Sequence, residues 1–209
     1  MSNGIFSTPQ PINEPIKGYA PKSTEKSDVK KTLADLRSTP TQIPLVIGGE
    51  HIVTPSTDPV ICPHNRSMIL GQTSRAGAKE TQMAIDACSK ARKDWAALPW
   101  EERAAVFLKA ADLLATKYRS KMNATTMLSQ SKTIFQAEID SACELIDFFR
   151  FNVHFAEQIY RQQPYSPAGQ WNRLTARGLE GFVYAIAPFN FTSISVNLAA
   201  APAIMGCSV

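Results

Sequence analysis

The 209-residue sequence lacks the features that mark several common classes of protein. It has no apolar run of the roughly 18 residues that a membrane-spanning helix needs, because Pro202 interrupts the apolar stretch near its end. Neither usual phosphate-binding loop, GxGxxG or GxxxxGKS/T, is present. The net charge is only +4, with basic and acidic residues interspersed, so no basic stripe indicates a nucleic acid or a membrane surface as a partner.

Cysteine and histidine are scarce as well. The four cysteines lie far apart and form no CxxC pair, and the three histidines lack the spacing of metal ligands. We therefore expect neither a disulfide framework nor a metal site, and we expect reduced thiols in an intracellular compartment. Residues 1–22 contain no arginine, include Glu14 and have no secretory hydrophobic region, so they are unlike a mitochondrial or a secretory signal.

The remaining composition is that of an ordinary globular protein, with 44% hydrophobic and 19% charged residues. Residues 1–42 are rich in Pro, Ser, Thr and Lys and predict an N-terminal arm with one helical stretch, SDVKKTLADLR. Two β-rich runs around a Gly-Gly pair predict a hairpin over residues 43–53. The spacing of apolar residues predicts helices from about residue 78, from residue 99, and after a capping-box pattern that starts at Thr133.

The most informative segment is GFVYAIAPFNFTSISVNLAAAPAIMG, residues 181–206. The near-continuous apolar run GFVYAIA predicts a strand buried on both faces of a parallel sheet. PFNF predicts a turn, and Thr192 or Ser193 can cap a helix that ends near Met205, with Gly206 after it. CSV then begins what we expect to be the next strand. A βαβ unit needs that strand, so the sequence is typical of a fragment that stops inside a structural element.

Two polar residues and one thiol stand out in this pattern. Asn190 lies between two phenylalanines at a strand–helix turn, where ligands bind in open α/β sheets, so its amide is a candidate donor to an oxyanion. The alternative is a hydrogen bond to its own backbone. Glu138 lies on the apolar stripe of a helix. A carboxylate on a buried face is expected to have a raised pKa or a specific partner, both of which are typical of functional sites. The alternative is a first-turn glutamate that the helix N-terminus stabilises. Cys207 begins an apolar strand, which favours a buried structural thiol over a nucleophile.

Several stretches resemble the aldehyde dehydrogenase superfamily. PFNF after an apolar strand is similar to the PWNFP-type turn of that superfamily. SQSKTIFQAEIDSACELIDFFRFN, QQPYSP and GLEGFVYAIAPFNFTSISVNLAAAPAIMG look like the delta-1-pyrroline-5-carboxylate dehydrogenases within it. The resemblance runs from about Asn13 to the end of the chain and is most specific between Lys132 and Gly206.

The resemblance implies an α/β fold, namely the N-terminal part of the aldehyde dehydrogenase fold. A helical layer over residues 78–163 is expected to cover the first βα unit of a Rossmann-like parallel sheet. The chain then divides into an N-terminal arm, residues 1–42, and a partial NAD-binding domain, residues 43–209, truncated at the second sheet strand.

The function implied by the resemblance is the NAD-dependent oxidation of L-glutamate γ-semialdehyde to L-glutamate in proline catabolism. A cysteine attacks the aldehyde, a hydride passes to NAD, and water releases the acid. The implied setting is a homo-oligomer in the mitochondrial matrix, with the cytoplasm as the alternative because no import signal is evident.

The resemblance also assigns roles to individual residues. Asn190 matches the oxyanion-stabilising asparagine, Phe191 a residue that packs on the aliphatic stem of the substrate, and Glu138 an acidic residue of the substrate pocket near the nucleophile. The strand end that holds the nicotinamide half of NAD is lined, through backbone groups, by Ala187, Pro188 and Phe189.

The sequence departs from the family pattern in several places. Ala187 stands where relatives often carry serine, Ser131 where glycine is usual and Cys207 where asparagine is usual. The family's ribose-binding lysine, catalytic cysteine, second active-site glutamate and oligomerisation strands match nothing in the chain. We therefore expect the 209 residues alone to lack dehydrogenase activity. The alternatives are a non-catalytic short isoform that associates with full-length subunits, and an unrelated helical binding module, which the strand–PFNF–helix pattern disfavours.

Overall fold

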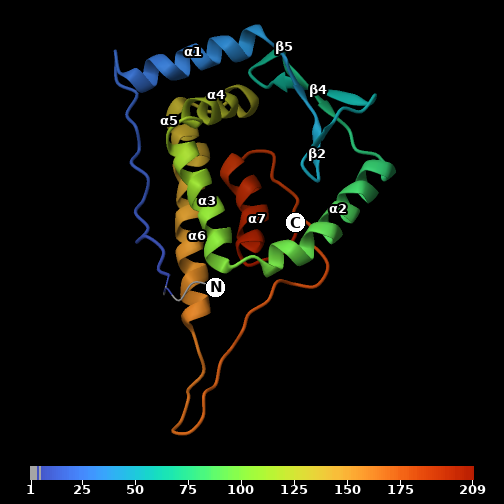
Figure 1. The fold of residues 1–209 in the computed structure, drawn as a ribbon. Helices are drawn as coiled ribbons and strands as arrows, with labels where there is room; N and C mark the ends of the chain where they lie inside the picture. The colour runs from blue at the N-terminus through green and yellow to red at the C-terminus, as the bar shows by residue number, and fades with distance from the viewer. Residues whose placement is uncertain (1–3, 5) are drawn as a thin grey trace.

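Helices make up most of the computed structural model, which describes residue 4 and residues 6–209 (Figure 1). Residues 1–3 and 5, at the start of the predicted arm, lie outside the described residues. The helical elements are α1 Thr24–Ser38, α2 Ala78–Ala97, α3 Trp100–Ala115, α4 Arg119–Gln130, α5 Ile134–Ala137, the π-helical turn η1 Glu138–Cys143, α6 Glu144–Arg161 and α7 Thr192–Ile204. The strands are β1 Thr41–Ile43, β2 Leu45–Ile47, β3 Glu50–Ile52, β4 Thr57–Cys62 and β5 Asn65–Ser74.

The hydrophobic core lies between α3, α6 and α7, which stand side by side in Figure 1. Phe107 of α3 meets Phe149 of α6 edge to face, with ring centroids 5.6 Å apart, a geometry that aromatic pairs favour. The apolar stripe predicted for the helix after Thr133 is confirmed, since its central residues are buried. They are Ala142, Leu145, Ile146, Phe149, Val153 and Ala156.

The capping box predicted at Thr133 is also confirmed, and it starts this long helix. The Thr133 hydroxyl accepts a hydrogen bond from the backbone N–H of Gln136, and the Gln136 side chain accepts one from the backbone N–H of Thr133. The helix then passes without a break from α5 through η1 into α6. A π-helical turn inserts extra backbone and is often found at functional sites.

Two small sheets pack beside the helices. The predicted hairpin is confirmed as β2 and β3, which pair antiparallel and turn through Gly48 and Gly49, both in the left-handed region that glycine favours. In the other sheet, β5 pairs parallel with β1 and antiparallel with β4, so β5 is the central strand. Residue 42, the predicted end of the arm, lies within β1.

The start of the arm runs along the long helix. The Thr8 backbone N–H donates to the Glu157 carboxylate at 2.6 Å, and the Glu14 backbone N–H donates to the Asp147 carboxylate at 2.7 Å. The carboxylates of the helix therefore fix the arm through its backbone groups. Among the described residues, no helix is long and apolar enough to cross a membrane.

The strands predicted near the end of the chain are not formed in this structure. Residues 181–187 are irregular, and Tyr184 and Ile186 are 79% and 72% exposed rather than buried. The Val183 backbone N–H donates to the Ser208 carbonyl at 2.9 Å, but no ladder follows, and residues 207–209 are irregular too. A strand needs a hydrogen-bonded neighbour along its length, and these residues have a single such contact. The prediction of a strand buried on both faces was therefore wrong for the described structure.

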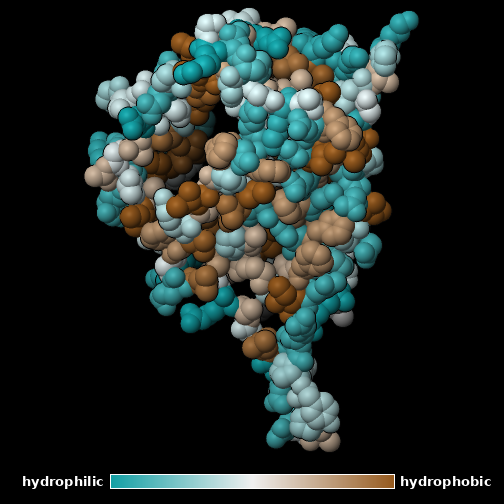
Figure 2. Space-filling view, turned by 180° about the vertical axis from the view of Figure 1, so that it is seen from behind, coloured by the Kyte–Doolittle hydropathy of each residue, from teal (hydrophilic) through white to brown (hydrophobic). Residues whose placement is uncertain are grey.

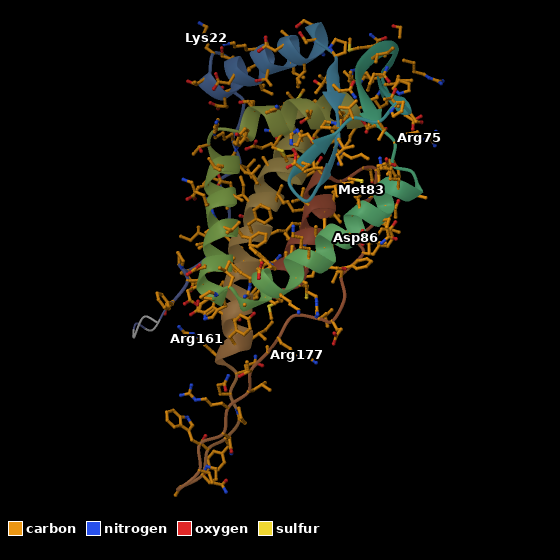
Figure 3. The ribbon with its side chains drawn as sticks, turned by 45° about the vertical axis from the view of Figure 1, so that its right-hand side comes forward. Lys22, Arg75, Met83, Asp86, Arg161 and Arg177 are labelled. Atoms are coloured by element: carbon orange, nitrogen blue, oxygen red, sulfur yellow. The ribbon has the colours of Figure 1, made fainter. Side chains whose placement is uncertain are left out.

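The segment between α6 and α7 leaves the helices as a long excursion and returns past α2 (Figure 1). Figure 3 shows Arg161 at the end of α6, where the excursion begins, and Arg177 on its returning part. Figure 3 also shows Met83 and Asp86 projecting from the outer side of α2. That side of α2 therefore faces solvent.

Candidate functional site

The PFNF turn brings the candidate residues Asn190 and Phe191 to the start of α7. The helix begins at Thr192, and its N-cap is Phe191, whose side chain makes no capping bond. The expectation that Thr192 or Ser193 would cap the helix was therefore wrong. The Thr192 hydroxyl instead accepts a hydrogen bond from Gln130 at 3.0 Å and lies 3.1 Å from the Thr126 hydroxyl. These bonds join the start of α7 to the end of α4.

The side chain of Ser195, one turn into α7, braces the turn from within. Its single hydroxyl hydrogen is shared between the Phe191 carbonyl, at 2.8 Å, and the Pro188 carbonyl, at 3.2 Å. Both carbonyls are thereby drawn toward the helix. The Ser195 hydroxyl thus holds the backbone of the turn at Pro188 and at Phe191, and Asn190 between them is exposed.

Asn190 itself is exposed, and its side-chain amide makes no hydrogen bond with any described residue. The alternative of a bond to its own backbone is not what this structure shows. A primary amide has two donor hydrogens, so both are available to a ligand. A donor to an oxyanion needs such a free amide hydrogen, so the role predicted for Asn190 stays a prediction.

The residues just before Asn190 offer backbone rather than side-chain groups. Ala187 is exposed, Pro188 is half-buried, and Phe189 is 93% exposed. No backbone hydrogen bond is formed within the described chain by the N–H groups of residues 184–187. These open backbone groups fit a segment that receives a ligand or a neighbouring strand.

Glu138, the first residue of η1, is fully buried, and described residues satisfy its carboxylate. The Arg119 guanidinium forms an ion pair with it. The Tyr19 hydroxyl and the Asn123 amide each donate to it at 2.7 Å, and the Lys17 backbone N–H donates at 2.8 Å. Burial alone would raise the pKa of this carboxyl, but Arg119 and the other donors outweigh burial and hold the pKa below its usual value.

The structure thus resolves the two expectations for Glu138 in favour of a specific partner, Arg119. Stabilisation by the helix N-terminus is not what it shows, because the continuous helix begins at Ile134, four residues before Glu138. It brings Asn190, Phe191 and the residues before them together at one turn. It does not place the Glu138 carboxylate on an open surface. Glu138 is connected to the turn only through other residues. Asp140, also in η1, contacts a lysine whose ammonium donates to the Asn190 carbonyl of the turn.

That lysine, Lys132, is a residue that the sequence analysis did not single out. Its ammonium lies 2.6 Å from the Asp140 carboxylate, donates to the Asn190 carbonyl at 2.6 Å, and lies 4.0 Å from the centroid of the Phe191 ring. The residue before it, Ser131, has a φ of 55° and ends α4 in the left-handed region. This explains why glycine is usual there in the family that the sequence resembles, since glycine adopts that conformation without strain.

A hollow of about 550 Å³ adjoins α7, between the β2–β3 hairpin and α2. Figure 2 shows apolar side chains around this hollow. The apolar residues that recur at helical spacing along α2 line this hollow without being buried. They are Ala84, Ala87, Cys88, Ala91 and Trp95.

The cysteine nearest to the Glu138 network is unsuited to nucleophilic attack. Cys143 is buried, and burial together with the Glu138 charge raises the pKa of its thiol to about 12. Cys207 is buried as well, and its Sγ accepts the Leu179 backbone N–H at 3.3 Å, which agrees with the structural role expected for it.

We expect Cys143 to resist alkylation in the folded chain. At about pH 8 a thiol with a pKa near 12 is ionised to only about one part in 10⁴, and burial blocks the reagent. Treatment with iodoacetamide followed by peptide mass spectrometry is expected to leave Cys143 unmodified until urea unfolds the protein. The urea-unfolded chain supplies the control rate, and equal modification of Cys143 in the folded chain would contradict the assignment.

The turn and the helices around it are similar to those of known proteins. A model of the aldehyde dehydrogenase family matches residues 53–209. The mitochondrial delta-1-pyrroline-5-carboxylate dehydrogenase of Emericella nidulans is 49% identical over 203 residues, which cover 96% of this chain and 35% of that protein. That of Dictyostelium discoideum is 47% identical over 199 residues, which cover 95% of this chain and 36% of that protein.

A solved structure shares the fold as well. The delta-pyrroline-5-carboxylate dehydrogenase from Mycobacterium tuberculosis, bound with NAD and cobalamin, has a TM-score of 0.97 and 52% identity, covering 99% of this chain and 39% of that chain. This confirms the predicted mixed α/β fold as the N-terminal part of the aldehyde dehydrogenase fold. The chain spans about a third of the length of the curated relatives it matches. It belongs to the aldehyde dehydrogenase family.

Proposed function

We propose that this chain forms one wall of the active site of an NAD-dependent dehydrogenase that oxidises L-glutamate γ-semialdehyde to L-glutamate in proline catabolism. Membership of the aldehyde dehydrogenase family and relatives named delta-1-pyrroline-5-carboxylate dehydrogenase support the reaction. The single observation that carries the proposal is the free, exposed amide of Asn190 on a braced turn before α7.

The chemistry that this wall supplies follows from the charge that develops during attack on an aldehyde. When a nucleophile adds to the carbonyl carbon, the carbonyl oxygen becomes an oxyanion. The Asn190 amide stabilises that oxygen by donating a hydrogen bond that is stronger in the transition state than in the ground state. Phe191 is proposed to pack on the aliphatic stem of the substrate, and Glu138 to shape the pocket wall from its buried position in η1.

The cofactor contacts proposed for this chain come from Ala187, Pro188 and Phe189. The exposure of Ala187 and Phe189 and the open N–H groups of residues 184–187 fit the nicotinamide half of NAD, which accepts a hydride when bound. Ala187 has no hydroxyl, so its contact with NAD is limited to its backbone. A relative from Mycobacterium tuberculosis was crystallised with NAD, which supports this cofactor.

The nucleophile is proposed to lie outside the residues described here, because Cys62, Cys143 and Cys207 are buried and Cys88 lines the hollow beside α2. The chain by itself is therefore proposed to be inactive. Several relatives are named mitochondrial, so we propose the mitochondrial matrix as its location and a homo-oligomer as its working form. The alternative is a non-catalytic short isoform that binds full-length subunits. The exposed apolar side chains of Tyr184, Ile186 and Phe189 favour such association.

A chimeric enzyme tests the proposal. Residues 1–209 replace the matching portion of the Mycobacterium tuberculosis enzyme, whose high structural similarity makes the junction compatible. We expect the chimera to reduce NAD when given glutamate γ-semialdehyde, and the 209-residue chain alone to show no reduction. The unaltered Mycobacterium tuberculosis enzyme is the positive control.

Two results would contradict the proposal. One is a chimera that folds and oxidises simple aldehydes but not the semialdehyde. The other is NAD reduction by the isolated chain. Co-purification of the isolated chain with full-length subunits, together with a measured effect on their activity, would support the short-isoform alternative instead.

A further inference from the structure

The side chain of Lys132 is largely enclosed between η1 and the PFNF turn. The Lys132 side chain is 14% exposed, and that of its ion-pair partner Asp140 is 20% exposed. Most lysine–carboxylate pairs lie in water and contribute little, whereas an enclosed pair is screened far less and holds a defined geometry. The ion pair with Asp140 therefore fixes the position of the Lys132 ammonium.

The second contact of the Lys132 ammonium is with Asn190 itself. An ammonium has three donor hydrogens. One points to the Asp140 carboxylate at 2.6 Å and one to the Asn190 carbonyl at 2.6 Å, while the cation also lies over the Phe191 ring. The first backbone bond of α7 uses the Phe191 carbonyl, not that of Asn190. Lys132 is thus the described partner of the Asn190 peptide group.

The position of Asp140 is fixed in turn by the buried start of η1. Glu138, two residues before Asp140, is held by Arg119, Tyr19 and Asn123 in the core. The π-helical turn therefore cannot shift without breaking that network. Asp140 offers its carboxylate from a rigid element, and Lys132 transmits that rigidity to an otherwise exposed turn.

We propose that Lys132 is a positioning residue that holds Asn190 in the orientation from which its amide meets the oxyanion. The inference rests on the proposed function of Asn190. An oxyanion donor is effective only when its direction is fixed before the reaction, and a displacement of about 1 Å can cost about 100-fold in rate. Lys132 touches neither of the amide hydrogens, so it acts through the Asn190 backbone.

A double-mutant cycle in the chimeric enzyme tests this inference. Lys132→Met keeps the aliphatic stem and removes the ammonium, and it is expected to lower kcat by about 10- to 100-fold with KM for the aldehyde unchanged. In an Asn190→Ala background the same substitution is expected to cause no further loss, because the group that Lys132 positions is already gone. Lys90→Met, an exposed lysine on the outer side of α2, is the matched control and is expected to leave kcat unchanged.

Each arm of the cycle decides a different question. Losses that multiply in the double variant would overturn the positioning role, as would a Lys132→Met enzyme with normal kcat. A normal kcat in the Asn190→Ala single variant would instead overturn the proposed function. If the Lys132→Met chimera does not fold, Asp140→Asn is used in its place. This change weakens the hold on Lys132 without touching the turn, and a smaller loss of kcat that disappears in the Asn190→Ala background is expected.

Hydrogen exchange on the 209-residue chain gives an answer that does not depend on catalysis. Lys132→Met is expected to speed amide exchange about 10-fold in peptides covering residues 188–195, because opening of the turn becomes easier. Lys90→Met is expected to leave those rates unchanged. Unchanged exchange in the Lys132→Met chain would overturn the inference even if kcat fell.

Discussion

Replacing Asn190 by alanine in the chimeric enzyme is expected to lower kcat by about 10²- to 10³-fold, equivalent to about 3–4 kcal/mol of transition-state stabilisation. The amide has no hydrogen-bond partner among the described residues, so its donors are free for the oxyanion alone. KM is expected to stay near its original value, because the oxyanion exists only after attack. Steady-state kinetics of NAD reduction measures both quantities.

Because the Asn190 amide has no partner among the described residues, its replacement is expected to affect catalysis without affecting stability. Asn190→Ala breaks no side-chain bond within the described structure, so the thermal midpoint is expected to stay within about 1 °C of the original, in line with other surface substitutions. Gln82→Ala removes an exposed amide that donates to Asp86 on the same helix at 2.9 Å, and serves as the control for loss of a surface amide, with kcat unchanged. A rise in KM with kcat intact would show that Asn190 binds the ground-state substrate, and would contradict the oxyanion role.

Much of the helical architecture could be predicted from local patterns. The capping box at Thr133 and the apolar stripe of α6 are properties of neighbouring residues, and so is the Gly-Gly turn between β2 and β3. In contrast, the short apolar face of α4, with Ala124 and Leu128 buried, is interrupted by polar residues. Arg119, Asn123 and Thr126 are buried there too, against partners supplied by other parts of the chain. Apolar periodicity is a weak signal for a helix in which buried polar and apolar residues alternate.

The sheets show the same limit. The pairing of β4 with β5 contains register shifts on either side of Ile61, and Pro59 interrupts the β-rich pattern of β4. Apolar and polar residues therefore do not alternate regularly along these strands. The opposite error occurred at residues 181–187, where the apolar pattern of a buried strand is present but the structure provides no paired neighbour. A strand is a property of two segments, and the sequence of one segment cannot specify it alone.

The candidate site divides in a similar manner. The PFNF turn identified Asn190 and Phe191 because the motif is contiguous. Lys132 lies 58 residues from Asn190 in the sequence, and nothing in its local pattern indicates that contact. Glu138 was found because a carboxylate on an apolar stripe is anomalous, but its partners come from α4 and from the arm. Sequence reasoning thus located the anomaly and could not name what resolves it.

Replacing Arg119 by methionine is expected to lower the free energy of unfolding by about 3–5 kcal/mol at neutral pH, the cost of removing one partner of a buried ion pair. The Arg119 side chain is 3% exposed and contacts the carboxylates of both Glu138 and Glu14. The same guanidinium donates to the Pro15 carbonyl at 2.8 Å, so the variant also loses a tie to the arm. Urea unfolding followed by circular dichroism measures the change.

The stability of the native chain and that of the Arg119→Met variant are expected to change with pH in opposite directions. In the native chain the pKa of Glu138 is held below its unfolded value, so the stabilisation is present above that unfolded value, about 4.3, and is lost as the pH falls through the folded pKa. Without Arg119, burial is opposed only by the uncharged donors, and we expect it to dominate and to raise the pKa of Glu138 instead. The Arg119→Met variant is then expected to lose stability as the pH rises from about 4 to 7, whereas the native chain gains or keeps it over that range.

Two further variants decide whether the uncompensated charge is the cause. Arg119→Met combined with Glu138→Leu is expected to recover about half or more of the lost stability, because removing both partners of a buried pair leaves no unpaired charge. Arg92→Met removes an ion pair with Glu180, whose side chain is 81% exposed, and is expected to cost less than about 1 kcal/mol. If the double variant is no more stable than Arg119→Met, the stability is lost because the packing of the arginine side chain is lost, and not because Glu138 is left unpaired. The Glu138 carboxylate would then hold η1, and with it Asp140 and Lys132, through packing rather than through its charge.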